Sequence, residues 1–241
     1  NTPISQYFGD MVNLQSDDRK GQITIYHLLT MSAGFHWPEF GEWNYFAPMR
    51  YTKNIIKFIL DRELESTPGT KTNYNSGCSH LLTAIIQRAT GAKAFEVAAQ
   101  YLFKPMGITE TRWYEIQGVN LGADGLDLKL IDMLKFGYLY LKKGCLFGNE
   151  IVPGEWIAES IVPRFLTYPD IGSYGYHLWS SSLRNDDGTE ISYYFAMGFG
   201  GQYIIVVPDY NMVAVFASRD FTDTLLPMRL FREYIIKSVK H

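Results

Sequence analysis

The sequence predicts an α+β fold, in which a mainly helical region is followed by an antiparallel sheet flanked by helices. Two observations predict this fold. Before about residue 165, apolar residues recur at helical spacing, most clearly at Leu81, Ile85 and Ala89. From about residue 170 onward, β-rich runs alternate with turn signals, and the clearest runs cover residues 203–207 and 212–217. Helices that precede strands in this way are typical of an α+β layout.

The helices of the first region have recognisable ends. Thr24 is expected to cap a helix that stops at Gly34, and Thr52 is expected to cap the next helix. Ser79 is expected to cap the apolar helix that follows it. Gly91 is expected to end that helix, because a left-handed residue is favoured just beyond a helix C-terminus.

The remaining signals complete the predicted order of elements. Helices are expected over residues 94–102 and 129–141, with a short one at residues 155–157. A strand is expected at residues 174–179, followed by a hairpin-type turn at residues 185–188. The chain closes with an amphipathic helix, whose inward residues are predicted to be Leu230, Phe231, Tyr234, Ile235 and Val239.

Composition excludes several classes of function. The chain has 241 residues, enough for one or two domains, and its formal charge of −3 with no basic stripe argues against a nucleic-acid partner. No apolar run is long enough to span a membrane. Cys78 and Cys145 make neither a disulfide framework nor a metal set. His36, His80 and His177 lack the spacing of metal ligands, so no metal is assigned.

The polar segment between Pro68 and the apolar helix carries the strongest chemical signal. If this segment is extended, Tyr74 and Ser76 point to the same side. A phenol has an ordinary pKa of about 10, and a neighbouring ammonium would lower it. Tyr74 could then take a proton from a serine nucleophile. The alternative is a tyrosine that only packs its ring and caps a loop, and the segment alone leaves both open.

Residues 35–46 form a loop with an unusual number of aromatic rings. Such a loop either packs over the core or walls a pocket. Trp37, in this loop, and Trp179, in the predicted strand, are therefore candidate pocket walls. Buried packing is the commoner role for tryptophan and stays the alternative.

Five segments of the chain match a known pattern, in family order. They are residues 23–34, the stretch from Pro68 to Gly91, residues 132–137, residues 155–157 and residues 196–202. Together they resemble the serine β-lactamase, esterase and DD-peptidase superfamily, in its class C branch. The resemblance covers nearly the whole chain and implies a β-lactamase/transpeptidase-like fold. It also implies a serine hydrolase that works through an acyl-enzyme.

The resemblance implies roles for particular residues. Tyr74 corresponds to the tyrosine of the family's Tyr-x-Asn motif, the base in acylation and the proton donor to the leaving group, and Ser76 stands at the Asn of that motif. Gly198 aligns with the glycine of Lys-Thr-Gly, which makes the backbone N–H of Phe199 the second oxyanion donor. Gly198 and Gly200 would let a substrate carbonyl approach the strand backbone. Their alternative explanation is a β-bulge.

The chain departs from the family pattern in three ways. No serine is followed three positions later by lysine, so we expect the nucleophile and its lysine upstream of this chain, and the activity of the isolated chain is left open. Ser76 replaces the motif asparagine, and Ala196 replaces the lysine that would hold a β-lactam carboxylate. Both replacements favour an esterase or amidase, similar to 6-aminohexanoate-dimer hydrolases and related carboxylesterases.

The predicted organisation is one integrated catalytic domain whose N-terminal portion is missing. Residues 1–165 form the mainly helical region with the Tyr-x-Ser motif, and residues 166–241 form the antiparallel strands and the closing helix. The family sheet pairs N-terminal with C-terminal strands, so an incomplete sheet predicts self-association. The expected partners are small ester, amide or peptide substrates, and no cofactor is expected.

Two alternative functions stay open at this stage. One is a non-catalytic binding module with a penicillin-recognising type of fold, and the other is a DD-peptidase or β-lactamase. The first residues, Asn1 to Phe8, are neither a signal peptide nor a start methionine, so the compartment is not assigned.

Overall fold

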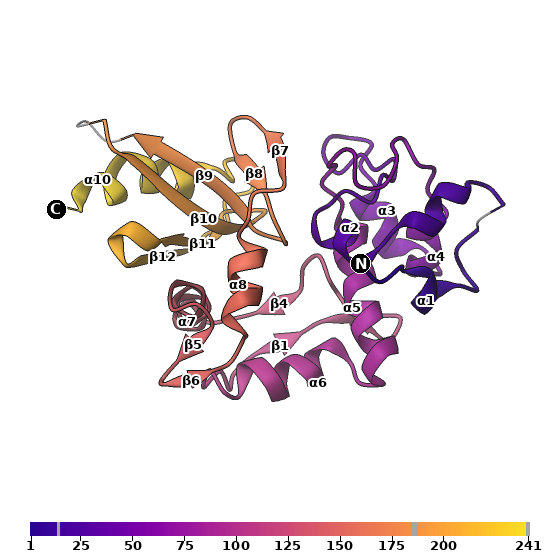
Figure 1. Cartoon of the computed structure of the whole chain (residues 1–241), viewed down its shortest axis with the longest axis horizontal. Helices are drawn as coiled ribbons and strands as arrows, with labels where there is room; N and C mark the ends of the chain where they lie inside the picture. Colours follow the sequence, from indigo (N-terminus) through magenta and orange to yellow (C-terminus); the bar gives the residue numbers. More distant parts are fainter. Residues whose placement is uncertain (14, 185–187, 240–241) are drawn as a thin grey trace. The chain divides into compact units, whose positions relative to one another are not determined.

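The computed structural model of the chain describes residues 1–13, 15–184 and 188–239 (Figure 1). They fall into two compact units. Unit 1 consists of residues 1–104 and 111–127, and unit 2 consists of residues 105–110 and 128–241. This division lies earlier in the chain than the change from helices to strands expected after residue 165, because helix α7 (Leu130–Leu141) packs on the sheet of unit 2.

Unit 1 is mainly helical. Its helices are α1 (Ser5–Phe8), α2 (Ile25–Leu29), α3 (Phe46–Tyr51), α4 (Ile55–Leu60), α5 (Ser76–Thr90) and α6 (Ala94–Ala98), with a 3₁₀ turn at Asp18–Gln22 and a π-helical turn at Ala99–Phe103. Among its described residues two short antiparallel pairs complete the unit: β1 (Arg112–Trp113) with β4 (Leu126–Asp127), and β2 (Glu115–Ile116) with β3 (Val119–Asn120).

Helix α5 is the central element of unit 1, and its first residues are buried. Its N-cap is Asn75, whose extended backbone lets the side-chain oxygen accept a hydrogen bond of 3.2 Å from the N–H of Cys78. The prediction that Ser79 caps this helix is therefore wrong. The predicted end is confirmed, since Gly91 is left-handed with a φ of 74°.

Of the two caps predicted for the shorter helices, the one at Thr24 is confirmed and the one at Thr52 is wrong. Thr24 caps α2 as predicted, and its hydroxyl accepts from the N–H of His27 at 3.4 Å. Thr52 does not cap the next helix. Asn54 does so, because its side-chain oxygen accepts from the N–H of Lys57 at 2.9 Å.

Unit 2 is built on an antiparallel sheet. Its described strands have the spatial order β12-β11-β10-β9-β8-β7, with β7 at Phe165–Tyr168, β8 at Gly172–Tyr174, β9 at Trp179–Arg184, β10 at Glu190–Gly198, β11 at Gln202–Val207 and β12 at Met212–Ala217. The other elements are α7, α8 (Gly154–Ser160), the pair β5 (Cys145–Leu146) and β6 (Asn149–Glu150), a 3₁₀ turn at Pro208–Tyr210, and the C-terminal helix. That helix consists of α9 (Leu226–Leu230), a π-helical turn at Phe231–Ile235 and α10 (Ile236–Ser238).

Both faces of this sheet are covered, α7 lying on one side and the C-terminal helix on the other (Figure 1). Successive strand residues point to opposite faces. On one face, the ring of Tyr193 meets that of Phe231 from the C-terminal helix, with centroids 5.3 Å apart. On the other, the ring of Tyr194 lies 6.2 Å from that of Tyr140 in α7. A strand that is buried on both faces has a continuous apolar sequence, as β11 does.

The predicted strands of the C-terminal part are confirmed in β11 and β12, but the strand predicted at residues 174–179 is wrong. Tyr174 ends β8 and Trp179 begins β9, and the connection between them contains His177 with a φ of 56°. The hairpin turn predicted at residues 185–188 falls largely on residues 185–187, which lie outside the described residues. Strands β9 and β10 pair on either side of it, with Arg184 opposite Glu190.

The closing helix is confirmed, but part of its predicted inward face is wrong. Phe231 is fully buried, whereas Leu230 and Tyr234 are 40% and 64% exposed. The π-helical turn explains the difference, because an extra residue in one turn shifts the positions that share a face. Phe231 and Ile236, five residues apart, are both fully buried.

Two further expectations concern surfaces. Strand β12 stands at the end of the strand order, and among the described residues no strand pairs with its outer side. Self-association through this edge stays a prediction. None of the helices in the described part of the chain is long and apolar enough to cross a membrane.

Substitution of Gly137 tests how tightly α7 is seated on the sheet. A β-carbon at this position would lie 2.5 Å from Val213 Cγ1 and 2.8 Å from Ile204 Cγ2. We expect Gly137→Ala to lower the free energy of unfolding by about 1–3 kcal/mol despite the higher helix propensity of alanine. Urea denaturation measures this change. Ile131→Ala, at a position of α7 that is 55% exposed, is the control, and equal stability losses in both variants would contradict the expectation.

Candidate active site

The segment that carries Tyr74 is held along its length by unit 1. The backbone N–H of Asn73 donates to Met31 O at 2.8 Å, and its side-chain amide donates to Trp37 O at 3.0 Å. Asn75 is extended, with a φ of −148°, and is 2% exposed. Ser76 is the first residue of α5 and not part of the preceding loop, and it is 5% exposed. Tyr74 itself is half-buried and lies between the hydrogen-bonded residues Asn73 and Asn75.

A carboxylate that the sequence did not single out lies against Ser76. The Oε2 atom of Glu39 accepts from the backbone N–H of Ser76 at 2.9 Å and from Trp37 Nε1 at 2.6 Å. The Oε1 atom accepts from the hydroxyl of Ser76. Glu39 is missing from the candidates because only its place among the rings of residues 35–46 marks it in the sequence.

Burial dominates the electrostatics of this cluster. Desolvation raises the pKa of Glu39, and the hydrogen bonds from Ser76 and Trp37 only partly oppose that shift. Burial, assisted by the nearby Glu39 charge, also raises the pKa of the Cys78 thiol. A thiol is a nucleophile only as its thiolate, so Cys78 is unsuited to that role although it lies close to the candidate residues.

The ring of Tyr74 has an aromatic neighbour from the same loop. The rings of Tyr74 and Phe40 are stacked, with centroids 6.0 Å apart and planes inclined by 24°. Phe40 is 64% exposed, so this contact leaves one of its faces to solvent. Lys71, near in sequence, has its Nζ 3.9 Å from a carboxylate oxygen of Glu65.

The two candidate wall residues lie inside their own units. Trp37 is 1% exposed, and its ring meets those of Tyr45 and Phe58 edge-on. Trp179 is 3% exposed, with its ring 4.7 Å from that of Tyr174. These surroundings favour the packing alternative for both side chains.

The glycine-rich segment forms the turn between β10 and β11. Gly198 pairs with Gln202, and the backbone N–H of Gly201 donates to Gly198 O at 3.1 Å. Gly200 has a φ of 93°, and a β-carbon there would lie 2.7 Å from a ring atom of Phe221. The pairing of β10 with β11 runs in continuous register to this turn, so the glycines serve a tight turn and not a β-bulge. Phe199, at the tip, is 72% exposed.

The predicted site residues thus form two groups. Tyr74 and Ser76 lie together in unit 1, and Gly198, Phe199 and Gly200 lie together in unit 2. Within the described residues, no three His, Cys, Asp or Glu side chains gather as a metal site would require.

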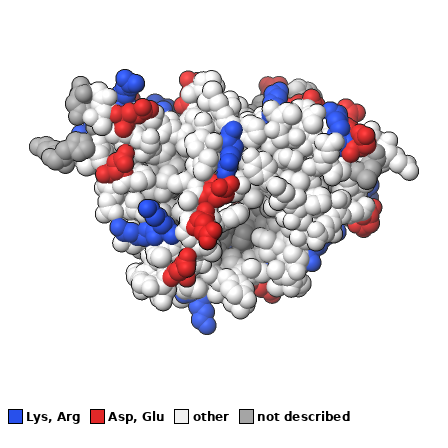
Figure 2. Space-filling model, in the orientation of Figure 1, with Lys and Arg blue, Asp and Glu red and all other residues white. Residues whose placement is uncertain are grey.

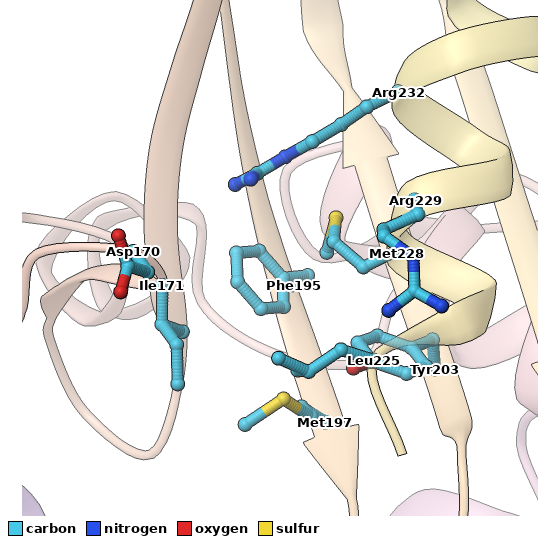
Figure 3. Close-up of a pocket in the computed structure, with 9 residues that line it drawn as sticks. All are labelled: Asp170, Ile171, Phe195, Met197, Tyr203, Leu225, Met228, Arg229 and Arg232. Atoms are coloured by element: carbon cyan, nitrogen blue, oxygen red, sulfur yellow. The ribbon is translucent and has the colours of Figure 1, made fainter. Parts of the chain in front are cut away.

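Unit 2 also contains a cavity of about 200 Å³ (Figure 3). Its lining consists of Asp170, Ile171, Phe195, Met197, Tyr203, Leu225, Met228, Arg229 and Arg232. The two arginines are already engaged, since Arg232 Nε donates to the hydroxyl of Tyr193 at 2.7 Å and Arg229 pairs with Asp223. None of the predicted site residues lines this cavity, so we assign it no ligand.

Charged side chains of both signs are interspersed on the face of the molecule that Figure 2 shows. Most of the described surface in that view belongs to uncharged residues.

The raised pKa of Glu39 predicts a pH dependence of stability. Between the unfolded and the folded pKa, the folded protein binds more protons, so the free energy of unfolding falls as pH rises through this range. We expect Glu39→Gln to lack this contribution and to gain stability relative to the wild type from about pH 4.5 upward. Urea denaturation at several pH values measures the difference. Glu42→Gln, at an exposed position of the same loop, is the control, and an identical pH dependence in both variants would refute the expectation.

Two curated proteins are similar to this chain. An uncharacterised protein of Alkalihalophilus pseudofirmus is 27% identical over 185 residues, which cover 65% of this chain and 54% of that protein. The lovastatin esterase of Penicillium rubens is 28% identical over 116 residues, which cover 46% of this chain and 29% of that enzyme. The chain therefore spans about half, or less, of the length of these relatives.

Solved structures share the fold. A Bacillus anthracis protein assigned as a 6-aminohexanoate-dimer hydrolase superposes with a TM-score of 0.76 at 20% identity, over 100% of this chain and 67% of its own. The penicillin-binding protein homologue of Pyrococcus abyssi gives a TM-score of 0.71 at 17% identity, over 98% and 59%. A family VIII carboxylesterase gives 0.68 at 13% identity, over 91% and 70%.

These likenesses confirm the β-lactamase/transpeptidase-like fold, with its helices and antiparallel sheet. The Beta-lactamase family model matches residues 1–229, nearly the whole length of the chain. The protein therefore belongs to the Beta-lactamase family, as its five sequence segments indicated.

Proposed function

We propose that the protein is a serine hydrolase that acts through an acyl-enzyme on carboxylic esters or small amides. The observation that carries the proposal is the anchored Tyr74–Ser76 segment at the start of α5, in a chain whose family match runs from residue 1 to residue 229. The lovastatin esterase, the 6-aminohexanoate-dimer hydrolase and the carboxylesterase among its similar proteins support this substrate class.

We propose that the nucleophile lies in a part of the protein that precedes Asn1. The chain contains no Ser-x-x-Lys, and it covers only 54% of the length of its uncharacterised relative. Cys78, a nucleophilic residue type four positions after Tyr74, is buried and has a raised thiol pKa, which makes it a poor substitute.

In the proposed reaction Tyr74 moves the proton. The phenolate of Tyr74 takes the proton of the serine hydroxyl as the serine oxygen bonds to the substrate carbonyl carbon. When the tetrahedral intermediate collapses, the bond to the alcohol or amine breaks and the proton passes from Tyr74 to that leaving group. Water then cleaves the acyl-enzyme by the same steps. The backbone N–H of Phe199 is the proposed second donor to the oxyanion.

Ser76 and Ala196 favour esters or simple amides over β-lactams as substrates. A serine at residue 76 has a shorter reach than the family asparagine, and here its hydroxyl is engaged with Glu39. Ala196, in β10, offers no cation to a substrate carboxylate. We therefore expect good turnover of short-chain esters and poor turnover of nitrocefin.

Fluorophosphonate labelling of the longest naturally expressed form tests the reaction class. We expect one labelled serine upstream of Asn1, in a Ser-x-x-Lys context that peptide mapping would identify. A labelled serine within residues 1–241 would overturn the assignment of the nucleophile. The absence of any label would favour the non-catalytic binding module, and release of D-Ala from a peptide ending in D-Ala-D-Ala would favour a DD-peptidase.

Tyr74→Phe tests the proton-transfer role directly. This change removes the hydroxyl but keeps the ring that stacks on Phe40. We expect kcat for a p-nitrophenyl ester to fall by about 10²–10⁴-fold, the usual contribution of a general base. Tyr51→Phe, at a position of unit 1 that is 89% exposed, is the matched control. Full activity in Tyr74→Phe would refute the role.

A further inference from the structure

We propose that Glu39 and Phe40 are positioning residues that together form a clamp on Tyr74, Glu39 through the backbone at Ser76 and Phe40 through the ring, so that the Tyr74 hydroxyl is held for proton transfer. The inference rests on the proposed function, since it assigns Tyr74 a part in acyl transfer. The clamp consists of two successive residues of the loop, one contacting Ser76 and the other contacting Tyr74.

The first contact fixes the main chain next to Tyr74. Glu39 accepts from both the backbone N–H and the hydroxyl of Ser76. A bond to the backbone N–H restrains the path of the chain, whereas a bond to the hydroxyl alone would restrain only a side chain. Because Ser76 is the first residue of a 15-residue helix, the carboxylate also lies at the favourable, positive end of the helix dipole.

The second contact fixes the ring. Phe40 stacks on Tyr74, and stacked aromatic rings attract each other beyond the effect of the area that they bury. Phe40 is 64% exposed, so core packing does not account for its place. A ring held on one face and a backbone held two residues later restrict both the position and the tilt of the phenol.

The loop that carries Glu39 and Phe40 is itself held by hydrogen bonds, so it can keep these two side chains in place against the Tyr74 segment. Trp37, 1% exposed, donates from Nε1 to Glu39 and accepts through its carbonyl from the side chain of Asn73. The backbone N–H of Tyr45 donates to Pro38 O at 2.8 Å. Asn73 precedes Tyr74 directly, so the same loop holds the segment before and after the tyrosine.

Kinetics of the longest naturally expressed enzyme test the clamp. We expect Glu39→Ala to lower kcat for a p-nitrophenyl ester by about 10–100-fold with little change in KM, because small displacements of a reacting group are costly. Glu39→Gln should recover most of this loss, since its amide oxygen can still accept from Trp37 and from the backbone of Ser76. Glu42→Ala is the control.

The double variant Glu39→Ala/Tyr74→Phe separates positioning from a general structural effect. If Glu39 acts through the hydroxyl of Tyr74, its removal should cost little further activity once that hydroxyl is absent. The same loss of kcat from Glu39→Ala in the wild-type and in the Tyr74→Phe background would overturn the proposal. Phe40→Leu should lower kcat in the wild-type background only.

Hydrogen exchange gives a readout that needs no activity. The Ser76 amide should exchange faster in Glu39→Ala, and about as in the wild type in Glu42→Ala. Unchanged exchange in Glu39→Ala would overturn the clamp even if the wild-type enzyme hydrolyses esters. A wild-type enzyme that neither hydrolyses esters nor takes the fluorophosphonate label would instead refute the proposed function, whatever the exchange result.

Discussion

The start of helix α5 is the constraint on which unit 1 depends. The first backbone N–H groups of a helix have no partner within it, and here they begin in the interior of the protein. Two acceptors from different sources meet this need: the side chain of Asn75 serves the N–H of Cys78, and Glu39 serves the N–H of Ser76. The second acceptor comes from 37 residues earlier, so satisfying the helix also ties the aromatic loop to the tyrosine segment.

Unit 2 solves a different problem, that of covering a sheet on both faces. The alternation along β10 sends Tyr193 toward the C-terminal helix and Tyr194 toward α7. Close seating of α7 requires a residue without a side chain at Gly137. The tight turn that ends β10 brings Gly198 and Phe199 to one end of the sheet.

The sequence predicted those features that depend on neighbours in the chain. The cap at Thr24, the end at Gly91 and strands β11 and β12 follow from local patterns. The cap of α5 does not, because Asn75 and Ser79 are both good capping residues and only the extended backbone of Asn75 decides between them. The contact of Glu39 with Ser76 joins residues far apart in the chain, so no local pattern predicts it. No local pattern predicts the π-helical turn after Leu230 either.

The two cysteines differ in accessibility, Cys78 being 1% exposed in α5 and Cys145 being exposed at the start of β5. A thiol-specific fluorophore would therefore attach to the folded chain at Cys145 without any substitution of Cys78. Since Cys145 belongs to unit 2, a second dye attached to unit 1 would complete a donor–acceptor pair for fluorescence energy transfer. The chain thus carries a natural labelling site for measuring the distance between the two units in solution.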